Sequence, residues 1–471
     1  MLTYTFDGIQ KESLYEHLYK CIRDDILSGT LSSGYHLPSK RTFAKNLGIS
    51  TITVENAYAG LIAEGYIYSV EKKGYFVSEV SADISRSVIP ARAAKQPAPP
   101  DKETETAGYT ADFVSGSMLP DLFPSATWTK LMRRVIGGKG SELMRQSPGG
   151  GIGPLREAIA DHLYQFRGLS VRPGQIFIGA GTEYLYGLII QLLGRDKTFA
   201  VEDPGYRKIT RIYRANDVAC TAVPLDPQGI DMRALRQSGA SIAHISPSHH
   251  FPTGIVTSIS RRYELLGWAA EAGDRYIIED DYDSEFRMNS RLIPTLRSID
   301  AVDRVIYINT FSKTLASTVR ISYMVLPASL IRAFEKKLGF YSCTVPSFNQ
   351  YTLAEFIRQG YFANHINRLR RYYKEQRNRI LSAFKENPAF AGAEIREENS
   401  GLHFLIKLHT EMTDTELKTA AERNGIRISC LSDYYARPAG AEQNVLLIQY
   451  ASVAPEKISA AVELLGKAVS R

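Results

Sequence analysis

The stretch Thr310-Phe311-Ser312-Lys313-Thr314-Leu315 places a lysine in a polar turn, directly after the apolar residues 305–308. Arg320 follows seven residues after that lysine. Upstream, Ile277-Ile278-Glu279-Asp280-Asp281-Tyr282 is a second apolar segment, and it ends in two aspartates and a tyrosine. A lone lysine after a strand is usually a solvated surface residue, so the chemistry of Lys313 depends on what stands beside it.

Four side chains from these segments are the groups needed to hold pyridoxal 5′-phosphate. Lys313 can form a Schiff base with the aldehyde of this cofactor, and the protonated imine is electrophilic. Asp280 can pair with the protonated pyridine nitrogen, unless it is only an acidic strand end that caps a helix. Tyr282 lies two residues further along, so it faces the same side and can reach the phenolic oxygen of the ring. Arg320 can bind the phosphate.

A glycine-rich turn supplies a second set of phosphate-binding groups. Gly179-Ala180-Gly181-Thr182-Glu183 ends an apolar segment and opens a helical pattern. Free backbone amides at a helix N-terminus bind anions, so Gly181, Thr182 and Glu183 are candidate cofactor residues. Such a turn is weak evidence when it stands alone. The hydroxyl groups of Thr310 and Ser312 are candidate donors to the same phosphate.

Bulk properties favour a multidomain intracellular protein. The chain has 471 residues, which is enough for two or three domains, and it is 44% hydrophobic and 23% charged. Its four cysteines form no CxxC pair, so we expect neither a disulfide framework nor a metal site. The start lacks a signal-peptide pattern, and the longest apolar run is too short to span a bilayer. We therefore expect a cytoplasmic protein with no membrane partner.

Residues 1–80 have the pattern of three short helices followed by a β-hairpin. Apolar residues recur every four positions from Ser13 to Ile26, Ser39 starts a second helix, and Ser50 caps a third. The hairpin turns at Glu71-Lys72-Lys73-Gly74. These residues carry eight basic and nine acidic side chains, so the net charge of +7 for the whole chain does not arise here. Any contact with DNA must come from local clusters of charge. The alternative is a small helical module without this function.

This layout resembles the winged helix-turn-helix of the GntR class of regulators over about residues 10–79. The resemblance is carried by Leu37-Pro38-Ser39-Lys40-Arg41, Leu47-Gly48-Ile49-Ser50, Thr53-Val54 and residues 61–66. It implies that the third helix meets base edges in double-stranded DNA and that the hairpin is a wing. The class usually has an arginine where this chain has Thr51. The candidate DNA-binding residues are Ser39, Lys40, Arg41, Ser50, Thr51, Thr53, Lys72, Lys73 and Gly74.

The rest of the chain divides into a linker and an α/β unit. Residues 81–110 contain four prolines and a polar run, which predicts a flexible linker. Residues 111–471 alternate short apolar strands with amphipathic segments, which predicts a mostly parallel sheet wrapped by helices. Three further apolar strands near residues 401–406, 426–429 and 445–450 predict a smaller C-terminal α+β lobe.

The α/β unit resembles the fold type I aminotransferases over almost its whole length. The motifs are Gly153-Pro154-Leu155-Arg156-Glu157-Ala158-Ile159, Gly179-Ala180-Gly181-Thr182-Glu183, Glu202-Asp203-Pro204-Gly205-Tyr206, Phe251-Pro252-Thr253-Gly254, Asp280-Asp281-Tyr282 and Thr310-Phe311-Ser312-Lys313. Together with the GntR-like region, the chain resembles the MocR subfamily of GntR-type regulators. The resemblance implies a homodimer, because the fold type I site is built at a subunit interface. It also allows a head-to-tail dimer in which the DNA-binding domains are exchanged between subunits.

The resemblance also marks residues for the substrate or effector. It places Tyr206 in the pocket with Arg207 beside it, although Tyr206 could instead pack under a loop. Phe251 stands where most aminotransferases have an asparagine that contacts the ring oxygen, so His249 is a candidate for a replacement contact. Asp433 stands where relatives have an arginine for the substrate carboxylate. An aspartate there would repel acids and attract amines.

Two functions remain open at this level. The first is a transcriptional regulator that carries pyridoxal 5′-phosphate on Lys313 and senses either the cofactor or an amino compound. The second is a working aminotransferase that also carries a DNA-binding domain. Release of pyridoxamine phosphate on addition of amino acids, compared with binding to the promoter region of the chain's own gene, distinguishes them.

Overall fold

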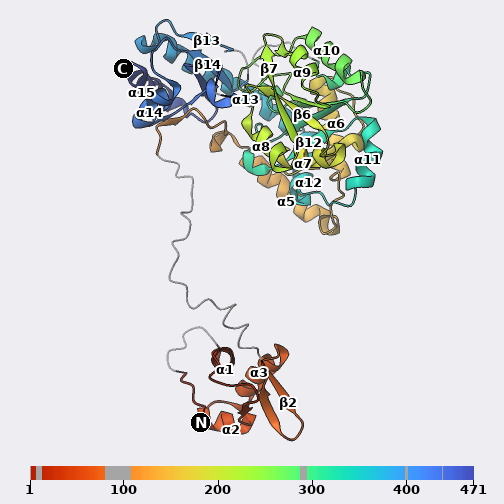
Figure 1. The fold of residues 1–471 in the computed structure, drawn as a ribbon, viewed down its shortest axis with the longest axis vertical. Coiled ribbons are helices and arrows are strands. Elements are labelled where there is room, and N and C mark those ends of the chain that lie inside the picture. Colours follow the sequence, from red (N-terminus) through yellow and green to blue (C-terminus); the bar gives the residue numbers. More distant parts are fainter. Residues whose placement is uncertain are drawn as a thin grey trace. The chain divides into compact units, whose positions relative to one another are not determined.

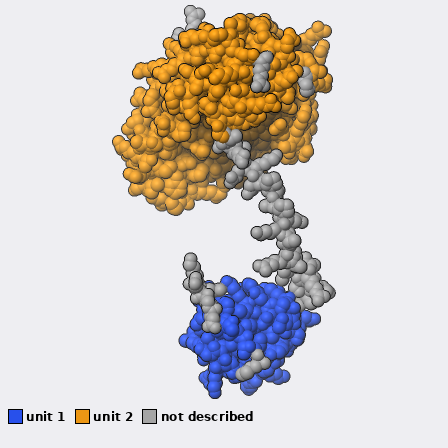
Figure 2. Space-filling model, turned by 90° about the vertical axis from the view of Figure 1, so that its left-hand side faces the viewer, with its two compact units in different colours: residues 1–105 blue, residues 106–471 orange. Residues whose placement is uncertain are grey.

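The chain folds into two compact units, residues 1–105 and 106–471 (Figure 2). A computed structural model describes residues 2–6, 13–79, 108–286, 294–397, 401–437 and 439–470. Nearly all of the predicted linker, residues 81–110, therefore lies outside the described residues. Residues 108–110, at the end of this range, are described and belong to unit 2, where the Thr110 amide donates to the Gly425 carbonyl at 2.8 Å.

Unit 1 has the three helices and the hairpin that the sequence predicts (Figure 1). A short strand before the second helix was not predicted, and it pairs with the hairpin to make a sheet of order β1-β3-β2. The helices bury one apolar face each, and Leu18, Phe43 and Tyr58 are fully buried between them. The elements are α1 (Leu14–Leu27), β1 (His36–Leu37), α2 (Lys40–Leu47), α3 (Thr51–Ala63), β2 (Ile67–Val70) and β3 (Gly74–Val77).

The larger part of unit 2 is built on an eight-stranded sheet of order β5-β12-β11-β10-β9-β6-β7-β8 (Figure 1). The pairs β10–β11, β10–β9 and β6–β9 are parallel, as the sequence predicts, and β6 also pairs in parallel with β7, a strand that was not predicted. Strand β12 was not predicted and runs antiparallel between β11 and β5. The strands are β5 (Ile176–Gly179), β6 (Thr198–Asp203), β7 (Ala219–Asp226), β8 (Gly229–Ile230), β9 (Ile242–Ile245), β10 (Tyr276–Asp280), β11 (Val305–Thr310) and β12 (Ser322–Val325).

Helices cover both faces of this sheet. Side chains alternate along a strand, and in β11 Ile306 and Ile308 pack with one helix set while Tyr307 packs with the other. The first set is α7 (Thr182–Leu193), α8 (Arg207–Ala215) and α11 (Ala328–Leu338). The opposite face carries α5 (Ser125–Leu143), α6 (Gly153–Arg167), α9 (Met232–Gln237), α10 (Ile259–Ala270) and α12 (Ser347–Arg358).

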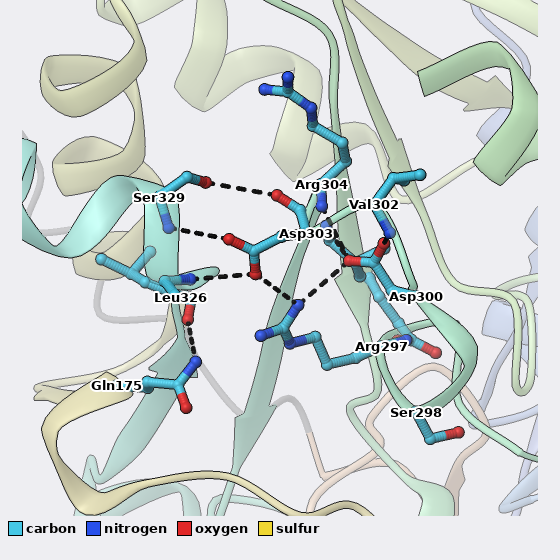
Figure 3. A network of polar contacts seen from close by, with 12 residues as sticks. Gln175, Arg297, Ser298, Asp300, Val302, Asp303, Arg304, Leu326 and Ser329 are labelled. Carbon is cyan, nitrogen blue, oxygen red and sulfur yellow. Dashed lines mark hydrogen bonds and ion pairs between the residues drawn. The ribbon is translucent and has the colours of Figure 1, made fainter. Parts of the chain in front are cut away.

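Two aspartates fix the approach to β11 (Figure 3). Asp300 Oδ2 accepts the backbone amides of Arg304 and Val305 at 2.8 and 2.9 Å. Asp303 accepts the amides of Ala328 and Ser329 at the start of α11, at 3.0 and 2.8 Å. Arg297 donates to both carboxylates. This network anchors the strand whose far end leads to Lys313.

The C-terminal lobe is α+β, as the sequence predicts. Its four-stranded sheet has the order β13-β14-β17-β16, and the pairs are antiparallel. The predicted strand over residues 426–429 is instead two short strands in different sheets. The elements are α13 (Tyr361–Glu386), β13 (Glu394–Arg396), β14 (His403–Lys407), α14 (Asp414–Arg423), β15 (Ile426–Arg427), β16 (Ser429–Cys430), β17 (Val445–Gln449) and α15 (Ile458–Val469), with β15 paired to β4 (Ala111–Asp112).

Candidate functional site

A cavity of about 580 Å³ opens at the carboxyl ends of β6, β10 and β11 in unit 2. This is the edge at which open α/β sheets bind ligands. Eleven of the thirteen residues that the sequence marks for cofactor and effector line this cavity. They are Gly181, Thr182, Glu183, Tyr206, Arg207, Asp280, Tyr282, Thr310, Ser312, Lys313 and Arg320. His249 and Asp433 are not among the lining residues.

Lys313 lies in the turn after β11 and points into the cavity wall. Its Nζ donates to the Gly116 carbonyl at 3.0 Å. Burial lowers the pKa of this ammonium group, and the charge of Asp283 partly opposes the shift. A Cβ on Gly116 would lie 2.6 Å from Nζ, so a larger residue at this position would displace the lysine amine from its present place. A lowered pKa increases the fraction of lysine that is a neutral amine, and the neutral amine is the form that attacks a carbonyl.

Asp280 ends β10 with one oxygen engaged and one available. Its Oδ2 accepts a hydrogen bond from the Tyr186 hydroxyl and lies 3.5 Å from His244 Nε2. Its buried Oδ1 has no hydrogen-bond partner among the described residues. A buried carboxylate oxygen without a donor is costly, so this atom fits the N–H of a protonated pyridine ring. The donor set therefore fits pyridoxal 5′-phosphate, which when bound would supply an electrophilic carbonyl.

The neighbouring Asp281 faces the opposite side of the sheet, as the alternation predicts. Its Oδ2 accepts Arg167 Nη2 and the Tyr307 hydroxyl, both at 2.7 Å. The same Arg167 nitrogen lies 3.2 Å from Ser248 Oγ. One buried guanidinium at the end of α6 thus connects the loop after β9 with the loop after β10, and both loops carry cavity residues.

Tyr282 lines the cavity, and His249 supports it from behind. The Tyr282 hydroxyl lies 3.4 Å from His249 Nδ1, and that nitrogen lies 2.6 Å from Asp283 Oδ2. The His249 ring stacks on His403 with a centroid distance of 4.7 Å. The contact between His249 and the cofactor ring stays a prediction: Nδ1 is turned toward Asp283, while the buried Nε2 has no hydrogen-bond partner among the described residues.

An anion cradle lies between the start of α7 and the turn after Lys313. Gly181 has a φ of 97°, and a Cβ on it would lie 2.7 Å from Arg320 Nη2. Arg320 Nη2 donates to the Ala180 carbonyl at 3.1 Å. Thr310 and Ser312 are joined through their hydroxyls at 3.0 Å. The positive charge, the two hydroxyls and the helix N-terminus together suit a phosphate.

The negative charge of Glu183 lies close to the positive charge of the cradle. Its carboxylate forms an ion pair with Lys208, and its Oε2 lies 3.8 Å from Arg320 Nη2. All three side chains are substantially exposed, so the pairs are screened by solvent. The backbone of Glu183 belongs to the first turn of α7, and this part of the residue fits the predicted role.

Sequence analysis missed a buried acid and its neighbour. Glu202 lines the cavity, and its Oε2 accepts the Ser246 amide at 2.8 Å. Burial raises the pKa of the Glu202 carboxyl to about 8. His250 Nε2 lies 3.5 Å away, and burial lowers the pKa of this imidazole to about 3. Glu202 stands in the quoted motif at 202–206, which was the available signal. Tyr186 and His244 had none, because only the fold brings them to Asp280.

The outer part of the cavity is aromatic and cationic. Tyr206 is 48% exposed and meets Phe251 edge-on, at a centroid distance of 5.9 Å. Phe251 makes a similar contact with Tyr434. Arg207 Nη1 donates to the Asp433 carbonyl at 3.1 Å, which holds this arginine at the cavity wall.

The Asp433 carboxylate lies elsewhere than the sequence predicts. Its Oδ1 accepts Lys418 Nζ at 2.5 Å, and its Oδ2 accepts the Cys430 amide at 2.9 Å. The charge is paired and both oxygens are engaged within the C-terminal lobe. The expectation that this carboxylate repels an acidic ligand is therefore not supported by the geometry.

Unit 1 presents the predicted DNA-contacting residues at helix starts and at the hairpin turn. Ser39 and Ser50 cap α2 and α3, each accepting a backbone amide, those of Thr42 and Thr53. Arg41 and Thr51 are exposed, and Thr53 is half-buried. Lys40 is partly engaged, because its Nζ lies 2.7 Å from Glu55 Oε1.

The hairpin between β2 and β3 carries its cations at the tip. Lys72 and Lys73 are exposed, and Lys72 has a φ of 58°. Gly74 opens β3 with a φ of 110°, and a Cβ there would lie 2.6 Å from His36 Nε2. The glycine therefore permits the close approach of β1 to the wing.

Comparison with known proteins identifies both units. Residues 14–77 match the family "Bacterial regulatory proteins, gntR family", and residues 115–465 match "Aminotransferase class I and II". The kynurenine aminotransferase of Pyrococcus horikoshii, solved in complex with PMP, has a TM-score of 0.69 at 23% identity, covering 81% of this chain and 97% of its own. The protein is thus a DNA-binding regulator with a fold type I aminotransferase-like domain and pyridoxal 5′-phosphate as its cofactor.

Curated relatives match nearly the whole length of the chain. The HTH-type transcriptional regulator YdeL of Bacillus subtilis (strain 168) is 37% identical over 424 residues, covering 90% of each chain. The probable rhizopine catabolism regulatory protein MocR of Rhizobium meliloti is 28% identical, covering 97% of this chain and 93% of its own. This chain belongs to the MocR subfamily of GntR-type transcriptional regulators. No helix in the described ranges is both long and apolar enough to cross a membrane.

Proposed function

We propose that the chain controls transcription by sensing pyridoxal 5′-phosphate, or an amino compound that reacts at its carbonyl, in the cavity of unit 2. One observation carries the proposal: Lys313 Nζ and the unpartnered Asp280 Oδ1 line a single cavity, in a chain that also has a DNA reader. In this proposal Lys313 holds the cofactor covalently, Asp280 keeps the ring nitrogen protonated, and Tyr282 meets the ring oxygen.

The phosphate would lie in the cradle formed by Arg320, Thr310, Ser312 and the start of α7. Arg320 supplies charge, and the amides of Gly181, Thr182 and Glu183 supply oriented donors. The lowered pKa of Lys313 supports its role, because the neutral amine is the nucleophile.

The effector would be an amino compound whose far end meets Arg207 and Tyr206. Asp433 pairs with Lys418 and is not among the residues that line the cavity, so its carboxylate does not act against an anionic ligand there. Arg207 is held by a carbonyl through one nitrogen, which leaves further donors for an anionic group. This favours an amino acid over a diamine, which reverses the preference inferred from the position of Asp433 in the sequence.

A working aminotransferase remains the second candidate, since Lys313, Asp280 and Tyr282 also suit transamination. The test is an amino-acid panel added to the purified, cofactor-loaded protein, with absorbance and pyridoxamine phosphate followed in parallel. The regulator predicts a spectral change without catalytic turnover, together with altered affinity for promoter DNA. Sustained turnover without any effect on DNA binding would favour the enzyme.

We also propose a homodimer that exchanges its DNA readers between subunits. Unit 2 exposes Met144 and Phe340, which are 74% and 77% accessible, and Gln146 donates to Ser342 between the segments that carry them. Large exposed apolar side chains of this kind mark interfaces. Light scattering of the full chain should give the mass of a dimer, and Phe340→Asp should shift it toward the monomer; a wild-type monomer rules the proposal out.

The organisation of the proposed regulator follows from its tasks. The domains in this proposal are residues 1–80 for DNA and 111–471 for the effector, joined by residues 81–110, most of which lie outside the described residues. Bacterial DNA and free amino compounds share the cytoplasm, and this is where we place the protein.

A further inference from the structure

The helix expected to enter the major groove lacks the residues that most often read guanine. Helix α3 contains neither lysine nor arginine in its thirteen residues. Arginine and lysine make the commonest specific contact with a base, through the O6 and N7 atoms of guanine. Base recognition by α3 must therefore depend on other side chains, and the cations predicted to contact DNA lie on α2 and the wing.

The exposed face of α3 instead carries an isoleucine. Ile52 is 68% accessible, more than any other large apolar side chain of the described part of unit 1. It lies in the first turn of the helix, next to the Ser50 cap and the exposed Thr51. The inner face is already filled by Val54, Ala57, Tyr58 and Leu61. Exposure of so large an apolar group at a helix N-terminus favours a partner that covers it.

A suitable polar side chain lies one turn further along the same face. Asn56 is exposed and stands four residues after Ile52, so the two side chains lie one above the other. An asparagine can pair with N6 and N7 of adenine through its carboxamide. The nearby Glu55 is less available, because Lys40 lies 2.7 Å from its carboxylate.

We propose that α3 reads A·T base pairs, with Ile52 against the 5-methyl group of a thymine and Asn56 on the N6 and N7 edge of an adenine. The thymine methyl is the one apolar feature that a base pair shows in the major groove. Lys72 and Lys73 then position the helix through phosphates and carry no sequence information themselves. The inference deepens the DNA-binding function and depends on it.

The test changes one chemical group of the DNA at a time. The operator is first located by footprinting the full-length, cofactor-loaded protein on the promoter region of its own gene. Each thymine in the protected sequence is then replaced by deoxyuridine, which lacks only the 5-methyl group. We expect one thymine in each half-site to be read by Ile52. Replacing that single thymine by deoxyuridine should lower the affinity of the wild-type protein roughly fourfold, which corresponds to the burial of one methyl group. Replacing an adenine by 7-deazaadenine should cost about tenfold at a position read by Asn56.

Matched variants assign each loss to its side chain. Ile52→Ala should bind the thymine and deoxyuridine operators equally, whereas Asn56→Ala should become insensitive to 7-deazaadenine. Ile52→Val, which keeps an apolar contact, should retain the preference for thymine and covers the case in which Ile52→Ala does not bind at all. Ile62→Ala, also partly exposed but at the far end of α3, is the control and should behave as wild type.

Two results would overturn the assignment. The first is a wild-type protein that binds every deoxyuridine-substituted operator as tightly as the thymine operator. The second is an Ile52→Ala variant that still prefers thymine. A protein that binds no DNA under any condition would instead argue against the DNA-binding function, and that outcome is visible at the footprinting step.

Discussion

At the scale of residues, the catalytic-type constellation in unit 2 was largely predictable. Lys313, Asp280 and Tyr282 stand in short motifs at strand ends, where the alternation of a strand decides which way each side chain points. Tyr186 and His244 could not be predicted, because they reach Asp280 from α7 and β9 only after the sheet has formed. The sequence places the Asp433 carboxylate at the ligand, whereas in the structure it forms an ion pair with Lys418 of α14. This pairing could not be predicted, because it depends on how α14 packs.

Lys313→Ala should abolish the adduct that borohydride reduction traps on the protein. The reason is that Lys313 is the amine at the cavity wall, and its pKa is lowered by burial. Absorbance and intact mass before and after reduction measure the adduct. Lys208→Ala, which removes an exposed lysine that pairs with Glu183, should leave the adduct in place. A reducible adduct in the Lys313 variant would assign the chemistry to another lysine.

Glu202→Gln should stabilise the protein increasingly as the pH rises. The pKa of this carboxyl is 4.5 in its ordinary state and about 8 in the folded protein. Between these values the folded state holds a proton that the unfolded state has released, so the stability of the wild type falls as the pH rises. The difference in unfolding temperature between variant and wild type should grow from pH 4.5 to about pH 8 and then level off.

The same substitution at Glu375, an exposed residue of α13, is the matched control and should show no such trend. A Glu202→Gln difference that is constant across this pH range would mean that the carboxyl is not held in its neutral form by burial.

Asp433→Asn should leave the spectral response to amino compounds unchanged. The ion pair with Lys418 is about one-third exposed on each side, so its loss should cost less than about 1 kcal/mol of stability. Arg207→Met, by contrast, should weaken the response to amino acids, because Arg207 lines the cavity. Titration by absorbance with the same compounds measures both variants. A changed response in Asp433→Asn would place this carboxylate at the ligand after all.

At the scale of elements, the helices of unit 1, its hairpin and the most apolar strands of unit 2 were predictable, the antiparallel β14 and β17 among them, while several other strands were not. The caps Ser39 and Ser50 mark the starts of α2 and α3, and both accept the expected backbone amides. Strands β1 and β12, like β7, were not predicted, and the reasons for β1 and β12 differ. The first has two residues, and the second, Ser322–Val325, follows the Lys313 turn too closely to stand out as a separate strand.

Arg41→Ala should weaken operator binding, because Arg41 is exposed in the first turn of α2, the helix that precedes the recognition helix. If it contacts a phosphate, affinity falls for all sequences and the slope of log K against log salt drops by about one. If it contacts a base, the loss is roughly 1–3 kcal/mol and specificity relaxes. Fluorescence anisotropy at several salt concentrations measures both, and an unchanged curve at every salt concentration would exclude Arg41 from the interface.

At the scale of the whole molecule, the order of the two parts was predictable because each has its own set of motifs. A winged helix-turn-helix and an aminotransferase fold each bury a separate core, so neither pattern disturbs the other. The sequence contains less information about how a ligand in one part changes the other. The free energy of that coupling is measured by the effect of a ligand on DNA affinity.

The most direct measurement is the affinity of the full-length, cofactor-loaded protein for its own promoter region, titrated with amino compounds and compared with Lys313→Ala. The sensor account predicts specific binding by both proteins. A compound that changes the absorbance of the wild type should also change its affinity for DNA by roughly fivefold or more, as typical allosteric coupling would give. The Lys313→Ala protein should not respond. Wild-type DNA affinity that stays constant while the cofactor spectrum changes would contradict the account.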